Sequence, residues 1–347
     1  MTTVQRVSFV GTAIVRRPRT VRAGWALVLV LLLLAIAAVS VAVGARDVAW
    51  QDILAAFGGA QETFSEAAVA KRIPRTLLAI LVGGALGLSG AVMQAVTRNP
   101  LADPGILGVN TGAALAVSIG IAWFGMWSYT AYIWTAIIGA AVTAALVYTI
   151  GSLGRGGATP LKLALAGAAA SIALSSFISA IVLGRNDIAS VIRSWQIGGV
   201  GGGSFDAIGQ VLPFLATGLL ISLLTARSLN SLALGDDVAA GLGERVALVR
   251  ATASLGAVIL CGAATAVAGP IGFVGLVVPH VVRLLAGPDN RWLLPLSVCG
   301  GAVLLLAGDI LGRLVVRPSE LDVGIVTAFV GAPFFIWFVR RQKVREL

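Results

Sequence analysis

Long uncharged apolar stretches are the feature that most limits what this chain can fold into. Residues 23 to 45 run without a charged side chain, and similar blocks recur as far as Val339. A helix needs about 20 apolar residues to cross a hydrocarbon core of roughly 30 Å, and it satisfies its own backbone hydrogen bonds where water is absent. We therefore expect an all-α, polytopic membrane protein.

Composition agrees with this interpretation and leaves little room for a soluble domain. The 347 residues are 58% hydrophobic and 12% charged, whereas a soluble domain is about 25% charged. The net charge of +10 is ascribed to cytoplasmic loops of a membrane protein, so no nucleic-acid partner is expected. We expect a basic cytoplasmic tail over residues 1–22, and an uncleaved transmembrane domain over residues 23–347.

Breaks at charged residues, prolines and glycines divide the apolar sequence into ten candidate spans. An even number puts both termini on one side of the membrane, and both tails are basic. With both termini in the cytoplasm, 17 of the 25 lysines and arginines lie on the cytoplasmic side, as the positive-inside rule requires. The expected location is the cell membrane. The spans are 23–45, 76–96, 106–124, 130–150, 161–184, 207–226, 247–267, 270–286, 292–308 and 323–339.

Several kinds of chemistry lack the residues that they need. A P-loop requires a lysine after glycine, and none of the three lysines follows one. His280 is the single histidine, and Cys261 and Cys299 lie far apart inside apolar blocks, which argues against a metal site or a disulfide. The acidic residues fall in connections or at span ends, which disfavours a proton- or sodium-driven carrier. We expect no catalytic residues and no cofactor bound by this chain.

A cytoplasmic segment after the sixth span has the pattern of a short surface helix. Asp236 and Asp237 favour a helix start, and Gly241 and Gly243 favour a stop. A short helix exposed on this face is typical of a docking site for a partner. The candidate residues are Gly235, Asp236, Asp237, Ala239, Gly241, Leu242, Gly243 and Glu244.

Three arginines lie on the side where the charge rule disfavours them, namely Arg72, Arg75 and Arg313. Two interpretations stay open. In one, Arg313 pairs with Asp309 at i, i+4 while the other two reach lipid headgroups. In the other, the three arginines form an electropositive surface for an acidic partner or cargo.

Small residues share faces of two spans. Gly83 and Gly87 lie on one face of the second span, where they allow close approach of another helix. Ser171, Ser175 and Ser179 form a stripe at i, i+4 and i+8 on the fifth span. The serine stripe is compatible with helix packing and with a polar strip along a translocation path, and the sequence does not decide between the two.

Several motifs resemble, in order, those of the permease subunits of ABC importers for iron-siderophores, haem and vitamin B12. They are residues 72–75 (RIPR), 83–94 (GGALGLSGAVMQ), 98–108 (RNPLADPGILG), 234–237 (LGDD), 268–280 (AGPIGFVGLVVPH) and 331–335 (GAPFF). The motif residues with an expected structural role are Asn99, Pro100, Pro104, Gly269, Pro270, Pro279 and His280. Within the family, residues 109–112, 228–232 and 289–292 are most similar to ferric-enterobactin permease subunits that work beside a second, related permease.

The resemblance implies the ten-span permease fold of type II ABC importers, with a second, related permease chain completing a central path. It implies that residues 235–245 lie in the cleft of a separate ATPase, present in two copies, which binds ATP and Mg. It further implies that a substrate-binding protein places glutamates on Arg72, Arg75 and Arg313, because guanidinium forks suit bidentate carboxylate pairing.

The function that follows from the resemblance is import of a ferric-siderophore, with ATP hydrolysis by the partner subunit. Vitamin B12 or haem is the alternative cargo. A stand-alone secondary carrier and a membrane-embedded enzyme are the alternatives from other classes.

One departure from the family pattern lies before the last span, where many members read Glu-Leu-Pro-Val-Gly. This chain has Asp322 in place of the proline. The change removes a fixed φ angle and adds an external carboxylate, so we expect the local geometry near Arg313 to differ.

Overall fold

The computed structural model describes residues 17–44, 48–59, 62–126, 128–153 and 160–343, which form helices and connections without strands. The remaining residues, including 1–16 of the predicted tail, lie outside the described part. The helices are α1 (Arg19–Ala42), α2 (Trp50–Phe57), α3 (Phe64–Thr97), η1 (Pro104–Leu107), α4 (Val109–Phe124), α5 (Tyr129–Ser152), α6 (Pro160–Gly184), α7 (Asn186–Ile197), α8 (Phe205–Leu224), α9 (Ala226–Leu232), α10 (Asp236–Gly241), α11 (Val246–Ala268), α12 (Val274–Ala286), α13 (Asn290–Val315) and α14 (Val323–Lys343).

Each of the ten predicted spans overlaps one apolar helix. Seven described helices are long and apolar enough to cross a membrane, and three shorter apolar helices lie in α4, α12 and α14. The prediction of an all-α polytopic fold is confirmed. The short helices α2, α7 and α9 were not predicted, and α3 begins twelve residues before the predicted span.

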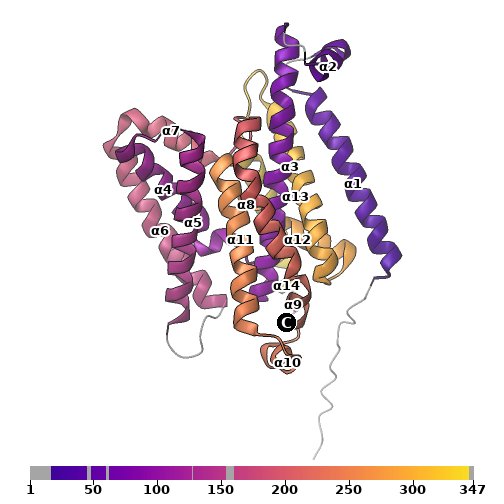
Figure 1. Ribbon diagram of the computed structural model, residues 1–347, viewed down its shortest axis with the longest axis vertical. Coiled ribbons are helices and arrows are strands. Elements are labelled where there is room, and N and C mark those ends of the chain that lie inside the picture. Colours follow the sequence, from indigo (N-terminus) through magenta and orange to yellow (C-terminus); the bar gives the residue numbers. More distant parts are fainter. Residues whose placement is uncertain (1–16, 45–47, 60–61, 127, 154–159, 344–347) are drawn as a thin grey trace, which may run out of the picture.

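The helices form one bundle around α3, which packs against α11, α12 and α13 (Figure 1). The group α4 to α7 covers one side of the bundle, and α1 with α2 covers the other. In Figure 1, α2 lies at one end of the bundle and α10 at the opposite end. We call these the α2 end and the α10 end.

Glycines set the distance between α3 and α13. A Cβ atom added at Gly87 would collide with the backbone carbonyl of Ser297, and one added at Gly83 would collide with the carbonyl of Gly301. Because the two backbones touch, even a methyl group has no room here. The close approach expected from the shared face of Gly83 and Gly87 is confirmed.

The helix α12 is too short to cross a membrane by itself, and the chain that leads into it from α11 turns inside the bundle. The 13 residues of α12 span about 20 Å, which is less than the roughly 30 Å of a hydrocarbon core. Gly269 has a φ of 68°, and its neighbour Ala268 accepts a 2.7 Å hydrogen bond from the Gly199 amide. Non-helical backbone at membrane depth is tolerated where protein groups satisfy it in this way.

The motif residues with an expected structural role lie in the connections after α3 and α11, at the start of η1 and inside α12. The Asn99 side chain accepts a 2.9 Å hydrogen bond from the Leu101 amide in the connection after α3, and Pro104 begins η1. Pro270 lies in the turn before α12, and Pro279 is buried inside α12. The Nδ1 atom of His280 lies 2.8 Å from the Leu276 carbonyl.

Substitution of Gly87 tests this packing. We expect Gly87→Ala to lower the stability of the purified chain by about 1–3 kcal/mol, because overpacking forces the backbones apart. Gly209→Ala is the matched control, since a Cβ atom on this helical glycine meets no neighbour within 4 Å. Thermal unfolding in detergent measures both variants. Equal melting temperatures for the two would contradict the packing described.

Candidate functional site

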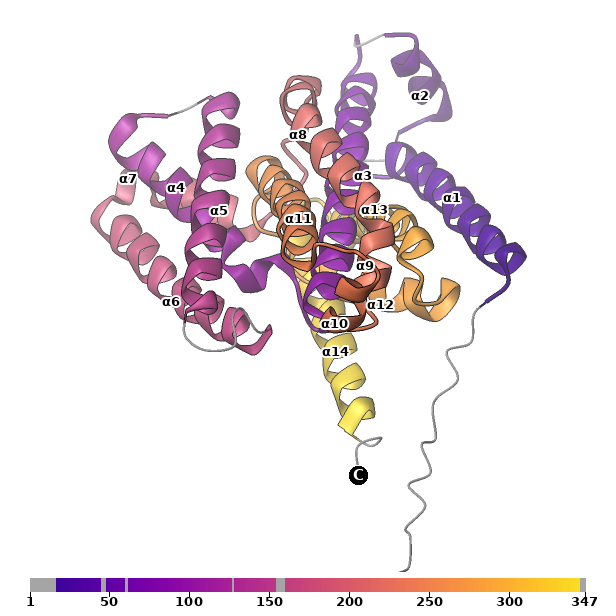
Figure 2. The same ribbon diagram turned by 60° about the horizontal axis from the view of Figure 1, so that its bottom comes forward.

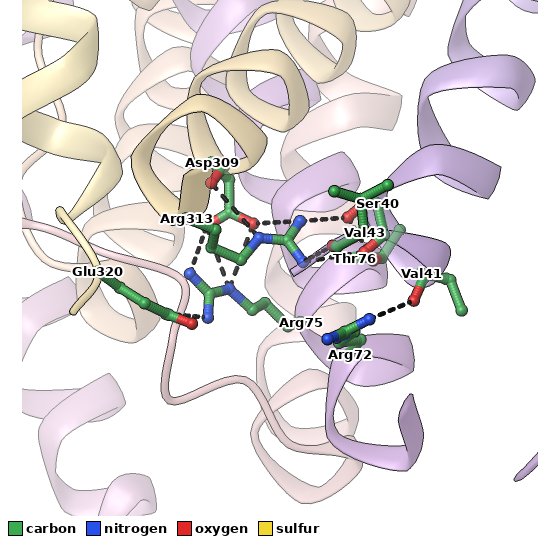
Figure 3. A network of polar contacts seen from close by, with 9 residues as sticks. All are labelled: Ser40, Val41, Val43, Arg72, Arg75, Thr76, Asp309, Arg313 and Glu320. Atoms are coloured by element: carbon green, nitrogen blue, oxygen red, sulfur yellow. Dashed lines mark hydrogen bonds and ion pairs between the residues drawn. The ribbon is translucent and has the colours of Figure 1, made fainter. Parts of the chain in front are cut away.

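Arginines and carboxylates gather at the α2 end, where the end of α1, the first turns of α3 and the last turns of α13 meet (Figure 3). We call the group Arg72, Arg75, Asp309, Arg313 and Glu320 the arginine cluster. The cluster contains all three arginines for which the sequence left two interpretations open.

Asp309 is the buried centre of the arginine cluster, with a side chain 1% exposed. Arg75 donates to its carboxylate through Nε at 3.1 Å and Nη2 at 2.8 Å. The Nη2 atom of Arg313 lies 3.0 Å from the other carboxylate oxygen. A buried carboxylate is tolerated when cations and hydrogen bonds compensate its lost hydration, and here two guanidinium groups do so.

Arginine side chains also cap the C-terminus of α1. The Nη1 atom of Arg313 donates to the carbonyls of Ser40 at 2.9 Å and Val43 at 3.0 Å. The last carbonyls of a helix lack intrahelical donors and carry the negative end of its dipole, so cations stabilise them. Two further arginines donate hydrogen bonds to neighbouring carbonyls. Arg72 donates to those of Val41 and Ala42, and Arg317 donates to that of Gly44.

These contacts bear on the two interpretations of Arg72, Arg75 and Arg313 that the sequence left open. The pair of Arg313 with Asp309 is present. Arg72 and Arg75 do not reach towards headgroups, because their guanidinium groups end on α1 and on carboxylates of the cluster. Arg72 is 7% exposed and Arg313 is 1% exposed, so neither presents its guanidinium to a second protein in this conformation. Arg75 differs, because its Nη1 atom lies 2.6 Å from the partly exposed carboxylate of Glu320.

Asp322, which replaces the family proline, lies in the connection before α14 close to this cluster. Partial burial raises the pKa of Asp322 above its ordinary value. Arg75 opposes this rise, whereas the like charges of Glu320 and Asp309 add to it. The substituted position therefore holds a carboxylate whose ionised form is disfavoured by its surroundings.

At the α10 end, one carboxylate joins three helices. Asp236 begins α10 and pairs with Arg98, which follows α3, and with Arg250 of α11 at 2.9 Å. Arg98 has a left-handed backbone conformation with φ 51°, which turns the chain out of α3 at this point. The pairing holds α10 against the ends of α3 and α11.

A second carboxylate anchors the segment before α10. Asp289 accepts hydrogen bonds from Asn230 of α9 at 2.8 Å and from Arg22 of α1 at 3.0 Å. Partial burial pushes the pKa of Asp289 upward, but the bonds from Asn230 and the Arg291 amide and the charge of Arg22 outweigh burial and leave the pKa below its ordinary value. The segment α9 to α10 is thus attached to the bundle through both carboxylates.

The structure divides the predicted docking residues of this segment. Asp236 to Gly241 form α10, as the start and stop signals indicate. Ala239 is fully buried, so it packs inward and does not face a partner. Sequence reasoning missed two exposed apolar residues of this segment, Leu234 and Val238. Together with Leu242 they are spaced four residues apart, and all three are more than half exposed. Leu234 and Leu242 flank α10 and Val238 lies on it, so the three form an exposed apolar patch, and their spacing of four is the signal that could have indicated it.

The serine stripe lies partly on an open cavity at the surface of the bundle, where Ser175 and Ser179 are both exposed. Ser175 and Ser179 line a space of about 250 Å³. Ser171 does not line it and instead lies beside Gly108. The other lining residues come from the start of α4, the middle of α6, the end of α7 and the turn before α12: Asn110, Thr111, Ala114, Ile178, Gln196 and Pro270. The polar residues among these sit at helix ends, outside any periodic stripe, which is why the sequence did not indicate them.

Among the described residues, no group of three or more His, Cys, Asp or Glu side chains is arranged to hold a metal ion. Asn110 instead uses its amide oxygen inside the protein, where it accepts hydrogen bonds from Thr265 at 3.0 Å and Cys261 at 3.3 Å. None of the described residues that line the cavity is charged, and amide and hydroxyl groups share the wall with Ala114, Ile178 and Pro270.

Removal of the Asp322 charge tests the raised pKa. A pKa raised in the folded state means that the ionised carboxylate opposes folding, so stability is lost as the pH rises through that value. We expect Asp322→Asn to melt above the unmodified chain at about pH 8, and the difference to vanish at about pH 3, where both side chains are neutral. Melting curves across this range measure the effect. A variant that melts lower at about pH 8 would contradict the assignment.

Comparison with known proteins places the chain among transport proteins. Residues 30–341 match the model of the FecCD transport family. The ferric enterobactin transport system permease protein FepD of Escherichia coli is 44% identical over 305 residues, which cover 87% of this chain and 91% of FepD. A probable siderophore transport system permease protein, YfiZ of Bacillus subtilis, is 41% identical with the same coverage. The hemin transport system permease protein HmuU of Yersinia pestis is 38% identical over 282 residues, 78% of this chain and 82% of HmuU.

A solved structure agrees with these relatives. It shows an inward-facing conformation of a metal-chelate type ABC transporter, and it matches this fold with a TM-score of 0.79 at 29% identity. The match covers 92% of this chain and 99% of the solved chain. The family model spans most of the sequence, and the fold agrees along nearly its whole length, so this chain belongs to the FecCD transport family.

Proposed function

We propose that this chain is the permease subunit of an ATP-driven importer that carries a ferric-siderophore across the cell membrane. The observation that carries the proposal is that the arginine cluster and the exposed apolar residues at α10 lie at opposite ends of one bundle of membrane-length helices. Membership of the FecCD family supports it, as do the names of the siderophore and ferric enterobactin permeases that this chain resembles. Vitamin B12 or haem is the alternative cargo, and the similarity to a hemin permease keeps haem open.

The α10 end is the proposed contact with the ATPase. Leu234, Val238 and Leu242 are exposed apolar residues on and beside α10. A cleft on a separate ATPase subunit would bury them, with one ATPase copy for each permease chain. The ATPase binds ATP and Mg and performs the hydrolysis. Because Asp236 ties α10 to α3 and α11, movement of α10 is passed to helices that run through the bundle.

The α2 end is the proposed contact with an external substrate-binding protein, at the arginine cluster. This assignment places the α10 end and both termini in the cytoplasm, which agrees with the distribution of lysines and arginines in the sequence. A second, related permease chain completes the path.

The cavity beside α6 is the proposed contact of this chain with the path. Helix ends and the turn before α12 meet there, and interrupted helices at membrane depth commonly line water-filled cavities and substrate sites. Neutral amide and hydroxyl groups on the wall can exchange hydrogen bonds with a passing chelate without holding it by charge. Ser175 and Ser179 are its members from the serine stripe; Ser171 is assigned to packing.

Polar substitution on α10 tests the ATPase contact. We expect Val238→Ser with Leu242→Ser to weaken binding of the cognate ATPase at least about tenfold, since full burial of one such side chain is worth about 1.5–3 kcal/mol and about 1.4 kcal/mol is tenfold. Leu153→Ser, at an exposed leucine that follows α5, is the matched control. Co-purification and ATP-dependent uptake in proteoliposomes measure the effect.

Unchanged ATPase binding in the double variant would reject the α10 contact. Uptake of chelate by the permease chain alone, without nucleotide, would favour the secondary carrier over the importer.

Filling the cavity tests the path. We expect Ser175→Trp to reduce uptake of the ferric chelate at least about tenfold, a barrier increase of about 1.4 kcal/mol, while the ATPase still binds. Phe177→Trp is the control on the same helix, because Phe177 is exposed and does not line the cavity. Equal uptake by the two variants would reject the cavity as part of the path.

A further inference from the structure

The accessible edge of the arginine cluster is already occupied by a carboxylate of the chain itself. Arg75 uses Nε and Nη2 for Asp309, and its Nη1 atom lies 2.6 Å from Glu320. The Glu320 side chain is 38% exposed, whereas that of Asp309 is 1% exposed. Of the two carboxylates on Arg75, one is therefore fixed inside the protein and the other lies at the surface.

The positions of the two carboxylates differ in a second respect. Asp309 belongs to α13, whose backbone is packed against α3, whereas Glu320 lies in the exposed connection of residues 316–320 between α13 and α14. Loss of Glu320 would leave Arg75 oriented by Asp309. Loss of Asp309 would leave the buried guanidinium of Arg313 and the partly buried guanidinium of Arg75 without their shared carboxylate.

We propose that Glu320 is an internal competitor for docking, and that it occupies the position on Arg75 that a carboxylate of the external binding protein takes when it binds. This inference rests on the proposed function of the α2 end. The partner group is a surface glutamate or aspartate, because the vacated Nη1 edge of Arg75 is a charge-assisted donor that matches a carboxylate. The exchange replaces one carboxylate by another, so no buried cation is left unpaired at any stage.

The charge of the cluster supports the competition. The three positive charges of its arginines exceed the two negative charges of Asp309 and Glu320, so the cluster has a net charge of +1. An approaching carboxylate therefore meets a nearly neutral surface with Glu320 in front of it. Removal of the Glu320 charge doubles the net positive charge of the cluster. It therefore strengthens the attraction of an acidic partner and also removes the carboxylate that competes with it for Arg75.

Binding of the cognate binding protein to the assembled importer in nanodiscs tests the proposal. We expect Glu320→Gln to tighten docking by about two- to fivefold, the range of an exposed ion pair, and to steepen its weakening by salt. Asp206→Asn is the matched control, because it removes one exposed carboxylate at the start of α8, outside the cluster. We expect its affinity to stay within twofold of the unmodified importer.

Arg75→Ala separates this inference from the docking proposal on which it rests. We expect it to weaken docking at least tenfold. If Arg75→Ala weakens docking while Glu320→Gln leaves affinity and salt dependence unchanged, the competition is overturned and the docking site stands. If Arg75→Ala has no effect, the docking site itself is overturned. Weaker docking of Glu320→Gln would also overturn the competition, since Glu320 would then assist the partner.

Discussion

The carboxylate of Asp309 is the charge on which the α2 end depends. A lone carboxylate with 1% of its side chain exposed would be strongly destabilising, so two guanidinium groups must remain beside it. Arg313 continues from Asp309 to the last carbonyls of α1, and Arg75 comes from α3. One buried charge therefore fixes α1, α3 and α13 relative to one another. It also gives a structural reason for arginines on the side that the proposed orientation places outside.

The α10 end follows the same principle. Asp236 is shared by cations from α3 and α11, and Asp289 joins α1, α9 and α13. Arg75 and Arg98 both belong to α3 or its cap, 23 residues apart, which is about 35 Å along a helix. A single packed helix thus connects the surface proposed for the binding protein with the surface proposed for the ATPase. In the proposed function, a rigid α3 would pass movement from one surface to the other.

Sequence reasoning predicted what depends on local pattern. The length of the apolar stretches predicted the ten spans, and the acidic residues followed by glycines predicted α10. The i, i+4 spacing of Asp309 and Arg313 indicated their pairing. It did not predict the bond of Arg75 to Asp309, 234 positions away, or the bond of Arg72 to carbonyls of α1, because these depend on how helices pack. The polar groups of Asn110 and Gln196 on the cavity wall were missed for the same reason, because the wall forms where the start of α4, the middle of α6, the end of α7 and the turn before α12 come together.

In the proposed function, the arginine cluster and α10 face opposite sides of the membrane. A chain with Cys261 and Cys299 replaced by serine, carrying either Ser319→Cys or Leu242→Cys, tests it through labelling by a membrane-impermeant maleimide in sealed right-side-out vesicles. Both positions are exposed. We predict that Ser319→Cys reacts at once and that Leu242→Cys reacts only after the vesicles are permeabilised. Labelling of Leu242→Cys in sealed vesicles would contradict the account.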